Sequence, residues 1–248
     1  MSSSQRIFEA LRAEILGGGF APGDRLPPER ALAELHDTNR NTLREALRKL
    51  EQLGLVRARQ GQGITVQDFR QAGTLDLLTP FVFEGGDVAE RVAVVVDLLH
   101  ARRHVLQDTI RLVAERRTDE DLARLSALAD AQVAAAERGD REAVVKGDIG
   151  FIDALFDASH SLTFRWIANS LLAVAREMVE RFPALWVHDA AYPAVVRTLV
   201  EALGERDGER AAEVLMAYYT RTDLVLVDQL RQLGQRAAAI QAMRGDAR

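Results

Sequence analysis

The sequence contains no cysteine among its 248 residues. This excludes a disulfide framework and thiolate chemistry, and it fits a cytoplasmic protein. No apolar run is long enough for a membrane-spanning helix, and the opening residues 1–6 do not resemble a signal peptide. No paired carboxylates, nucleophile–base set or glycine-rich phosphate loop stands out, so we do not expect an enzyme.

An excess of basic residues is also lacking, since the formal net charge is −5. Residues 1–68, the N-terminal head, carry 10 Lys and Arg against 9 Asp and Glu, and the rest of the chain carries 22 against 28. A near-neutral head argues against a protein that coats DNA without sequence preference. It still allows one basic face if the acidic side chains lie elsewhere.

The chain is organised around residues 26–56, which predict two short helices joined by a polar turn. The first helix opens at Pro28 and Glu29, because proline and an acidic side chain both suit a first helical turn. The turn is His36-Asp37-Thr38. The positions expected to face inward on the first helix are Ala31, Leu32 and Leu35.

The second helix begins near Asn39 or Arg40 and has two distinct faces. Its buried face is predicted to hold Leu43, Ala46, Leu47 and Leu50. Its exposed face begins with Asn39, Arg40, Asn41, Thr42 and Arg44. Such side chains at a helix N-terminus suit phosphates and base edges in a DNA groove, although many arginine-bearing amphipathic helices are simply solvated surface.

Two short strands, 55–57 and 64–66, follow around a glycine turn at residues 59–63. A helix pair followed by such a hairpin is a winged helix-turn-helix. Residues 5–67 also resemble the DNA-binding domain of the GntR family of bacterial transcription regulators. The matching segments are residues 15–18, 22–30, 40–47, 54–56 and 61–63, and the turn at residues 36–39 departs from the family pattern.

The resemblance implies that the head binds double-stranded DNA, with its second helix as the recognition helix. Arg30, Arg40 and Arg44 are the first candidates for DNA contact, with Asn41 and Thr42 on phosphate or base edges. Gly61 at the wing tip permits close approach to the minor groove. The full set of expected DNA-binding residues is Arg30, Asn39, Arg40, Asn41, Thr42, Arg44, Gln60 and Gly61.

The rest of the chain reads as mainly α. Residues 69–84 are expected to form a linker with a short helix at 75–78, residues 85–235 an all-α bundle of six to seven helices, and residues 236–248 a tail. Ser4 is expected to cap the first helix of the head, and Thr118 with Asp121 to form a capping box.

The bundle resembles the FCD ligand-sensing domain of the FadR branch of the same family. The matching residues are Asp97-Leu98-Leu99, Arg102-Arg103, Leu106, residues 114–116 and 118–122, Asp148, Phe151, Leu155, Ala158-Ser159, Ala202-Leu203, Asp207 and Ala211. The branch implies a homodimer whose two heads read a short palindromic operator under control of a small-molecule effector.

Many FCD domains bind a divalent metal through one Asp and three His. Carried over by position, these ligands are Asp148, Ile152, Val196 and Tyr218, so one of four survives and we expect no metal or other cofactor. His100 and His104 have a chelating spacing but more often such pairs are surface residues, and His160 and His188 are expected at helix ends.

Metal-free members of the branch accept larger, more apolar effectors, and fatty acyl-CoA is the known case. An organic acid or acyl-CoA-like effector is therefore expected, with Arg102 or Arg103 at the position that holds its anion. The expected effector-binding residues are Arg102, Arg103, Asp148, Ile152, Val196 and Tyr218. Aromatic and Met side chains could line the cavity or be plain core, namely Phe151, Phe156, Trp166 and Met178.

Two functions remain open at this point. The first is a homodimeric, effector-controlled transcription regulator, for which the sequence does not distinguish a repressor from an activator. The second is a helical small-molecule-binding protein or enzyme whose head serves only in assembly. A catalytic constellation in the bundle would favour the second, and the sequence offers none.

Overall fold

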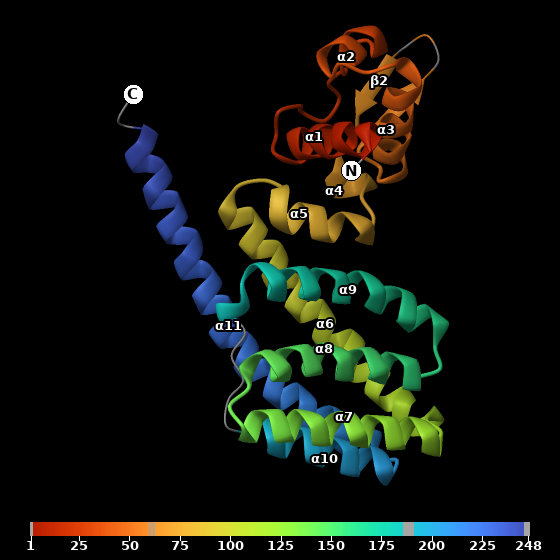
Figure 1. Cartoon of the computed structure of the whole chain (residues 1–248), viewed down its shortest axis with the longest axis vertical. Coiled ribbons are helices and arrows are strands. Elements are labelled where there is room, and N and C mark those ends of the chain that lie inside the picture. The colour runs from red at the N-terminus through yellow and green to blue at the C-terminus, as the bar shows by residue number, and fades with distance from the viewer. Residues whose placement is uncertain (1, 60, 62, 186–190, 246–248) are drawn as a thin grey trace. The chain divides into compact units, whose positions relative to one another are not determined.

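The computed structural model describes residues 2–59, 61, 63–185 and 191–245, with no side-chain description at 184 and 236–245. The chain divides into two compact units, Met1–Arg91 and Val92–Arg248. The expected fold class is confirmed: helices and a two-stranded sheet in the first unit, then a helical bundle (Figure 1). In the described part of the chain, no helix combines the length and apolar character that crossing a membrane requires.

The N-terminal unit begins with α1 (Ser3–Leu16), α2 (Glu29–Leu35) and α3 (Arg40–Gln52). Ser2 caps α1 by accepting a hydrogen bond from the Gln5 amide, so the prediction that Ser4 is the cap was wrong: Ser4 is buried inside the helix. α3 packs against both α1 and α2. Fully buried leucine and isoleucine side chains form this core: Ile7, Leu11, Ile15, Leu32, Leu43, Leu50 and Leu55.

The wing consists of β1 (Val56–Arg59) and β2 (Gly63–Val66), which pair antiparallel from Val56 opposite Val66 to Arg59 opposite Gly63. Gly54 makes the turn from α3 into β1 with φ +73°. A Cβ there would lie 2.4 Å from the Ala72 carbonyl oxygen, so the turn needs glycine for its backbone conformation and for space.

Residues 69–84, predicted as a linker, are largely helical: α4 (Phe69–Ala72), η1 (Leu75–Leu77) and α5 (Leu78–Glu84). α5 packs against α1, and Arg12 donates hydrogen bonds of 3.0 and 2.7 Å to the Glu84 carboxylate. Apolar side chains such as Phe81 and Val82 are buried here, so the stretch is part of the first compact unit, which ends at Arg91.

The second unit contains α6 (Val88–Arg116) from Val92 onward. Its other helices are α7 (Asp119–Glu137), α8 (Arg141–Ala158), α9 (Leu162–Arg181), η2 (Pro183–Leu185), α10 (Tyr192–Gly204) and α11 (Gly208–Gly245). α7 packs against α8 and α10, α10 against α11, and α8 against α9 (Figure 1). α11 continues as helix through most of the stretch predicted as a tail. The Thr118–Asp121 capping box at the start of α7 is confirmed.

Two arginines cap helix ends in the bundle: Arg117 is buried and Arg206 is exposed. Arg117 donates from Nε to the Leu203 carbonyl at 2.8 Å and from Nη2 to the Gly204 carbonyl at 2.7 Å, at the end of α10. Arg206 caps α6 in the same way, because its guanidinium donates to the carbonyls of Ala114 and Arg117 at the end of that helix. The C-terminal carbonyls that a helix leaves unpaired are thereby satisfied in both helices.

Candidate nucleic-acid interface and ligand site

The turn between α2 and α3 sets how α3 presents its first residues. Asp37 takes a left-handed conformation with φ +47°, and Asn39, the residue before α3, acts as its N-cap. The Asn39 side-chain oxygen accepts hydrogen bonds from the Thr42 amide at 3.0 Å and the Thr42 hydroxyl at 3.2 Å. The helix therefore begins at Arg40, and the side-chain oxygen of the exposed Asn39 is engaged in capping.

The two faces of α3 are those that the sequence predicts. Leu43, Ala46, Leu47 and Leu50 are buried. Asn39, Arg40, Asn41 and Arg44 are exposed, and Thr42 is half-buried. The predicted polar residues are thus brought together at one helix N-terminus, where free amides and the helix dipole favour phosphate.

Two of the three predicted arginines form ion pairs with nearby carboxylates. Arg44 Nε lies 2.8 Å from a Glu29 oxygen, and Arg30 Nε lies 3.0 Å from Glu34. Among the described residues, Arg40 has no carboxylate within ion-pair distance, and it is exposed. Exposed pairs of this kind are weak, so phosphate can exchange for the carboxylate at Arg44 and Arg30.

Ala31 and Leu35 were predicted to face inward, and both predictions were wrong: both residues are exposed, Leu35 to 74%. α2 has only seven residues, and its buried positions are Leu32 and Ala33. Leu35 is the last residue of the helix, where the chain turns at His36 and no core continues beneath it.

The wing tip carries Gly61, which is exposed and has φ +76°. This left-handed conformation favours glycine even though nothing crowds the site. Gln60, the other predicted wing contact, lies outside the described residues. The hairpin holds its tip in place through the β1–β2 pairing and through Leu26, whose amide donates to the Ile64 carbonyl at 2.9 Å.

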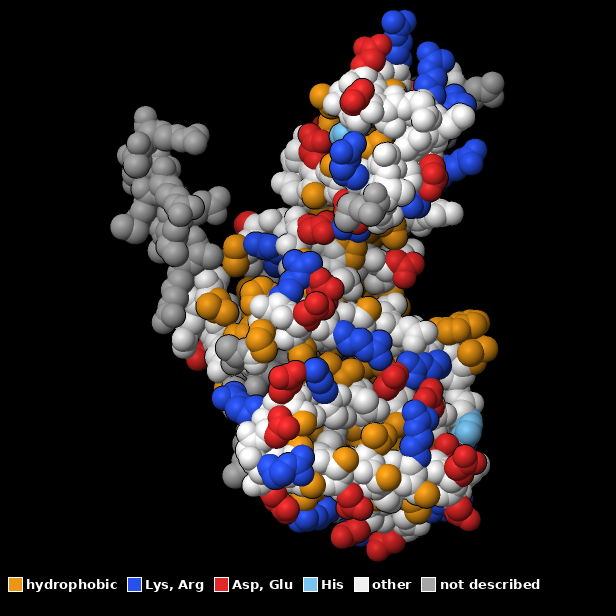
Figure 2. Space-filling model, viewed as in Figure 1, with side chains coloured by type: hydrophobic (Ala, Val, Ile, Leu, Met, Phe, Trp, Pro, Cys, Tyr) orange, Lys and Arg blue, Asp and Glu red, His pale blue; other side chains and the backbone are white. Residues whose placement is uncertain are grey.

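Further exposed arginines lie beside the predicted contacts: Arg25, Arg48, Arg57 and Arg59. Figure 2 shows Lys and Arg side chains projecting from the end of the N-terminal unit where α2, α3 and the wing lie. The sequence holds signals for them, since Arg48 follows Arg44 by four residues on a helix and Arg57 and Arg59 alternate with Val56 on a strand. The interface is therefore more basic than the predicted set alone.

In the bundle, the structure brings together four of the predicted effector residues. Ile152, Val196 and Tyr218 belong to one buried cluster with Tyr192. The Tyr192 hydroxyl donates to Asp148 Oδ1 at 3.0 Å, and the Tyr192 and Tyr218 rings lie 5.5 Å apart. Tyr192 was not predicted from the sequence, because no local sequence pattern indicates that residue 192 lies close to residue 148 in the fold.

Tyr192 and Tyr219 of this cluster stay neutral. Burial, reinforced by the Asp148 carboxylate, raises the pKa of Tyr192 far above its usual value, and burial raises that of Tyr219 as well. A neutral phenol donates a hydrogen bond and is a poor metal ligand. The described residues also contain no cluster of three or more His, Cys, Asp or Glu side chains. This donor set does not match the one Asp and three His of the metal-binding FCD domains.

Both candidate anion-binding arginines engage the same carboxylate. Arg102 Nη2 lies 2.6 Å from Asp223 Oδ1, and Arg103 Nη1 lies 3.2 Å from Asp223 Oδ2. The Arg102 guanidinium also lies 4.2 Å from the centre of the Tyr219 ring, which is next to Tyr218. Arg102 therefore connects directly to the tyrosine cluster. Asp223 was not found from the sequence.

The other candidates from the sequence fall in three places. Phe151, Phe156 and Met178 are buried, as plain core residues would be. Trp166 is 63% exposed, so it does not line an interior cavity. His100 and His104 are exposed, and His160 follows the end of α8 with its Nε2 2.8 Å from Asp121, whereas His188 lies outside the described residues.

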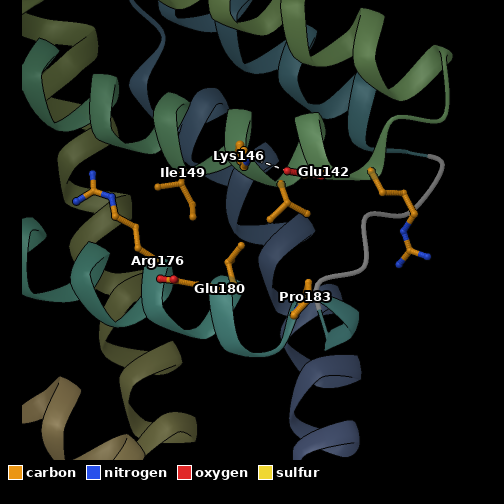
Figure 3. Close-up of a pocket in the computed structure, with 9 residues that line it drawn as sticks. Glu142, Lys146, Ile149, Arg176, Glu180 and Pro183 are labelled. Carbon is orange, nitrogen blue, oxygen red and sulfur yellow. Dashed lines mark hydrogen bonds and ion pairs between the residues drawn. The ribbon is translucent and has the colours of Figure 1, made fainter.

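A separate cavity of about 670 Å³ opens between α8 and α9 (Figure 3). Apolar side chains and ionic ones share its wall: Arg141, Glu142, Val145, Lys146, Ile149, Arg176, Val179, Glu180 and Pro183. Lys146 is paired with Glu142 at 2.6 Å. None of the predicted effector residues lines this cavity.

Comparison with known proteins agrees with both parts of this description. Residues 3–66 match the model of the bacterial regulatory proteins of the gntR family, and residues 97–221 match the FCD domain model. The HTH-type transcriptional regulator Mce2R of Mycobacterium tuberculosis (strain CDC 1551 / Oshkosh) is 32% identical, covering 91% of this chain and 93% of the relative. The galactonate operon transcriptional repressor of Escherichia coli (strain K12) is 28% identical over 89% of this chain and 96% of its own length.

A solved structure supports the fold. Lar, which controls the expression of the Listeria monocytogenes agr system, superposes with a TM-score of 0.59 at 17% identity, covering 94% of this chain and 98% of the other. These findings support a DNA-binding regulator and not a bundle whose head serves only in assembly. The chain belongs to the GntR family of bacterial transcriptional regulators, with a DNA-binding head of that family and an FCD effector domain.

Proposed function

We propose that the protein is a homodimeric repressor that binds a short palindromic operator and responds to an organic acid or acyl-CoA-like effector. The observation that carries the DNA-binding part is the start of α3, where Arg40, Asn41 and Arg44 are exposed together beside the wing. A winged helix-turn-helix uses this position of its second helix to contact bases in the major groove.

Roles follow from the chemistry of each side chain. Arg40 has no acidic partner among the described residues, so it is the first candidate for a bidentate contact to guanine. Arg30 and Arg44 exchange their carboxylates for phosphates, and Asn39, Asn41 and Thr42 add contacts to phosphate or base edges. Gly61 and Gln60 place the wing tip at the minor groove.

Dimerisation follows from how such heads achieve specificity. One head reads only a few base pairs, and a two-fold dimer presents two recognition helices to symmetric half-sites. Repression is inferred from the relative that is named as an operon repressor.

The effector site is proposed to lie in the bundle without a metal. Arg102 and Arg103 supply positive charge, and the tyrosine cluster around Asp148 supplies a neutral donor at Tyr192 and apolar surface. Elemental analysis of the purified protein should find no stoichiometric divalent metal, and EDTA should leave operator binding unchanged. A stoichiometric metal would contradict this part.

The test of the whole proposal is selection of bound fragments from a random DNA pool with the full-length protein at near-physiological salt. We expect enrichment of one short inverted repeat, because a symmetric dimer imposes two half-sites. Enrichment of a single half-site would exclude the dimer. Binding without any sequence preference would exclude the regulator.

A further inference from the structure

Asp223 of α11 is a carboxylate buried against two arginines of α6. Its side chain is only 7% exposed, and those of Arg102 and Arg103 are 18% and 22% exposed. Each carboxylate oxygen takes one arginine: Oδ1 accepts from Arg102 at 2.6 Å and Oδ2 from Arg103 at 3.2 Å. Neighbouring guanidinium groups would hold the carboxylate of a small molecule in the same way.

The position of this group links it to the predicted effector site. Arg102 lies over the ring of Tyr219, whose centre is 5.7 Å from that of the Tyr218 ring. Tyr218 stands at a position where the resemblance to metal-binding FCD domains implies a metal ligand. Tyr218 in turn contacts Tyr192, which donates to Asp148. The arginine pair is therefore one end of a continuous polar and aromatic cluster in the interior of the bundle.

Asp223 does not satisfy every hydrogen-bond donor of the Arg102 guanidinium. Arg102 Nε is buried without a hydrogen-bond partner among the described residues, although a guanidinium can present Nε and Nη2 side by side to both oxygens of one carboxylate. Asp223 uses its second oxygen for Arg103. A carboxylate that is not fixed to a helix can take the unused donor and so satisfy a group that Asp223 leaves unpaired.

We propose that Asp223 is an internal substitute for the effector's carboxylate: it occupies Arg102 and Arg103 in the effector-free bundle, and a carboxylate-bearing effector displaces it. The proposal rests on the effector site proposed above. Displacement removes the ion pairs that join α11 to α6 through this residue, so effector binding changes how the two helices are held. The charged and titratable groups that face Asp223 are Arg102, Arg103 and His100, with Tyr219 beside them.

The proposal can be tested without knowing the effector, by replacing the lost carboxylate. In full-length Asp223→Ala, two arginines lose their shared anion, so the urea midpoint should fall. Acetate, titrated against chloride at constant ionic strength, should restore the midpoint with saturation. Wild-type protein should need an acetate concentration about ten-fold higher or more, because its own carboxylate competes. If Asp223→Ala does not fold, Asp223→Ser also leaves room for acetate beside the arginines and takes the same titration.

Asp153 provides a matched control, since it also contacts two arginines, Arg165 and Arg176, but its side chain is 31% exposed. Asp153→Ala should show no saturable acetate effect. Equal responses of both variants and the wild type would reduce the effect to general salt stabilisation and overturn the proposal. Absence of any acetate effect on the Asp223 variants would also overturn it.

A second measurement separates this inference from the proposed function. Asp223→Asn should change the affinity for the selected operator in the absence of any effector, whereas Asp153→Asn should leave it unchanged. If the wild type binds the operator and Asp223→Asn binds it equally well with and without acetate, the carboxylate is purely structural and the proposal fails. If no operator is found, the proposed function fails, and the acetate titration still reports on the site.

Discussion

The two units of the molecule use arginine in opposite ways. In the N-terminal unit, the side chains of Arg30 and Arg44 are 80% and 59% exposed and pair loosely with acids on the same surface. In the bundle, Arg117 is 6% exposed and held by backbone carbonyls, and Arg102 is fixed between Asp223 and Tyr219. Exposed guanidinium groups can exchange partners at little cost, whereas buried ones cannot lose a partner without a penalty.

This difference predicts separate consequences for mutation. Loss of a head arginine should reduce DNA affinity and leave folding intact, and loss of a buried bundle arginine should reduce stability. Variants that fail to separate in this way would show that burial does not divide the roles of the arginines.

The largest effect is expected for Arg117→Ala. It removes the guanidinium hydrogen bonds to the carbonyls of Leu203 and Gly204, of which the Leu203 carbonyl keeps the Arg206 amide as a donor at 3.2 Å. The loss should lower the free energy of unfolding by about 3 kcal/mol. Urea unfolding followed by circular dichroism measures this. Arg197→Ala is the control, because Arg197 is exposed and its ion pair with Glu137 is long at 3.4 Å. Its effect on the free energy of unfolding should stay within about 0.5 kcal/mol. Equal losses of unfolding free energy in the two variants would contradict the contrast between buried and exposed arginines.

Arg40→Ala should show the reverse behaviour. Loss of a bidentate contact should weaken binding to the selected operator by about 1–3 kcal/mol, or roughly five-fold to 150-fold, with an unchanged urea midpoint. Fluorescence anisotropy with the operator and with a scrambled duplex measures the specific part. Arg138→Ala, an exposed arginine of the bundle, controls for net charge. Retained operator affinity would exclude Arg40 from the interface.

A smaller effect is expected at the start of α7. Thr118→Ala removes the capping box and should cost about 1 kcal/mol at neutral pH. Burial by itself would raise the pKa of Asp121, but hydrogen bonds from Thr118 and His160 lower it overall.

The lowered pKa of Asp121 makes its contribution to the free energy of unfolding depend on pH. Because the folded-state pKa of Asp121 lies below its unfolded value of about 3.9, its contribution is present above that pH and is lost as the pH falls through the folded pKa. The difference in urea midpoint between wild type and Thr118→Ala should therefore shrink as the pH is lowered from 5 to 3. A constant difference would mean that the threonine acts without the carboxylate.

The smallest effect is expected for Glu29→Gln. This change frees Arg44 from a competing carboxylate 2.8 Å away, and exposed pairs of this kind contribute about 0.2–1 kcal/mol. Operator affinity should rise by up to about five-fold, with a steeper dependence on salt. Glu34→Gln tests the same idea at Arg30. Weaker binding in Glu29→Gln would show that the acid positions Arg44 for DNA.

Local patterns predicted those features whose causes are local. The buried face of α3 follows from helical periodicity, and the capping box follows from two side chains three residues apart. Leu35 fits the same periodicity, but its helix ends before a core residue can cover it. The stretch at 69–84 has no strong period because its apolar residues pack in short turns and a two-turn helix.

The interior of the bundle was only partly predictable. Arg102, Asp148 and Tyr218 could be predicted as effector-binding residues through the resemblance to a family. Asp223 and Tyr192 could not, because their contacts with residues 102 and 148 join positions 121 and 44 residues apart. Such contacts depend on how whole helices pack, which side-chain periodicity does not encode.

The mutual capping by Arg117 and Arg206 has a consequence for the order of folding. The Arg117 hydrogen bond to the Leu203 carbonyl joins residues 86 positions apart, so this guanidinium cap, unlike the local Arg206 amide bond to the same carbonyl, cannot form until nearly the whole bundle has been assembled. Loop closure over that length favours late formation. We therefore expect a low φ-value at Arg117. Its loss should accelerate unfolding and leave the refolding rate almost unchanged, which means that the Arg117 guanidinium slows unfolding of the finished domain.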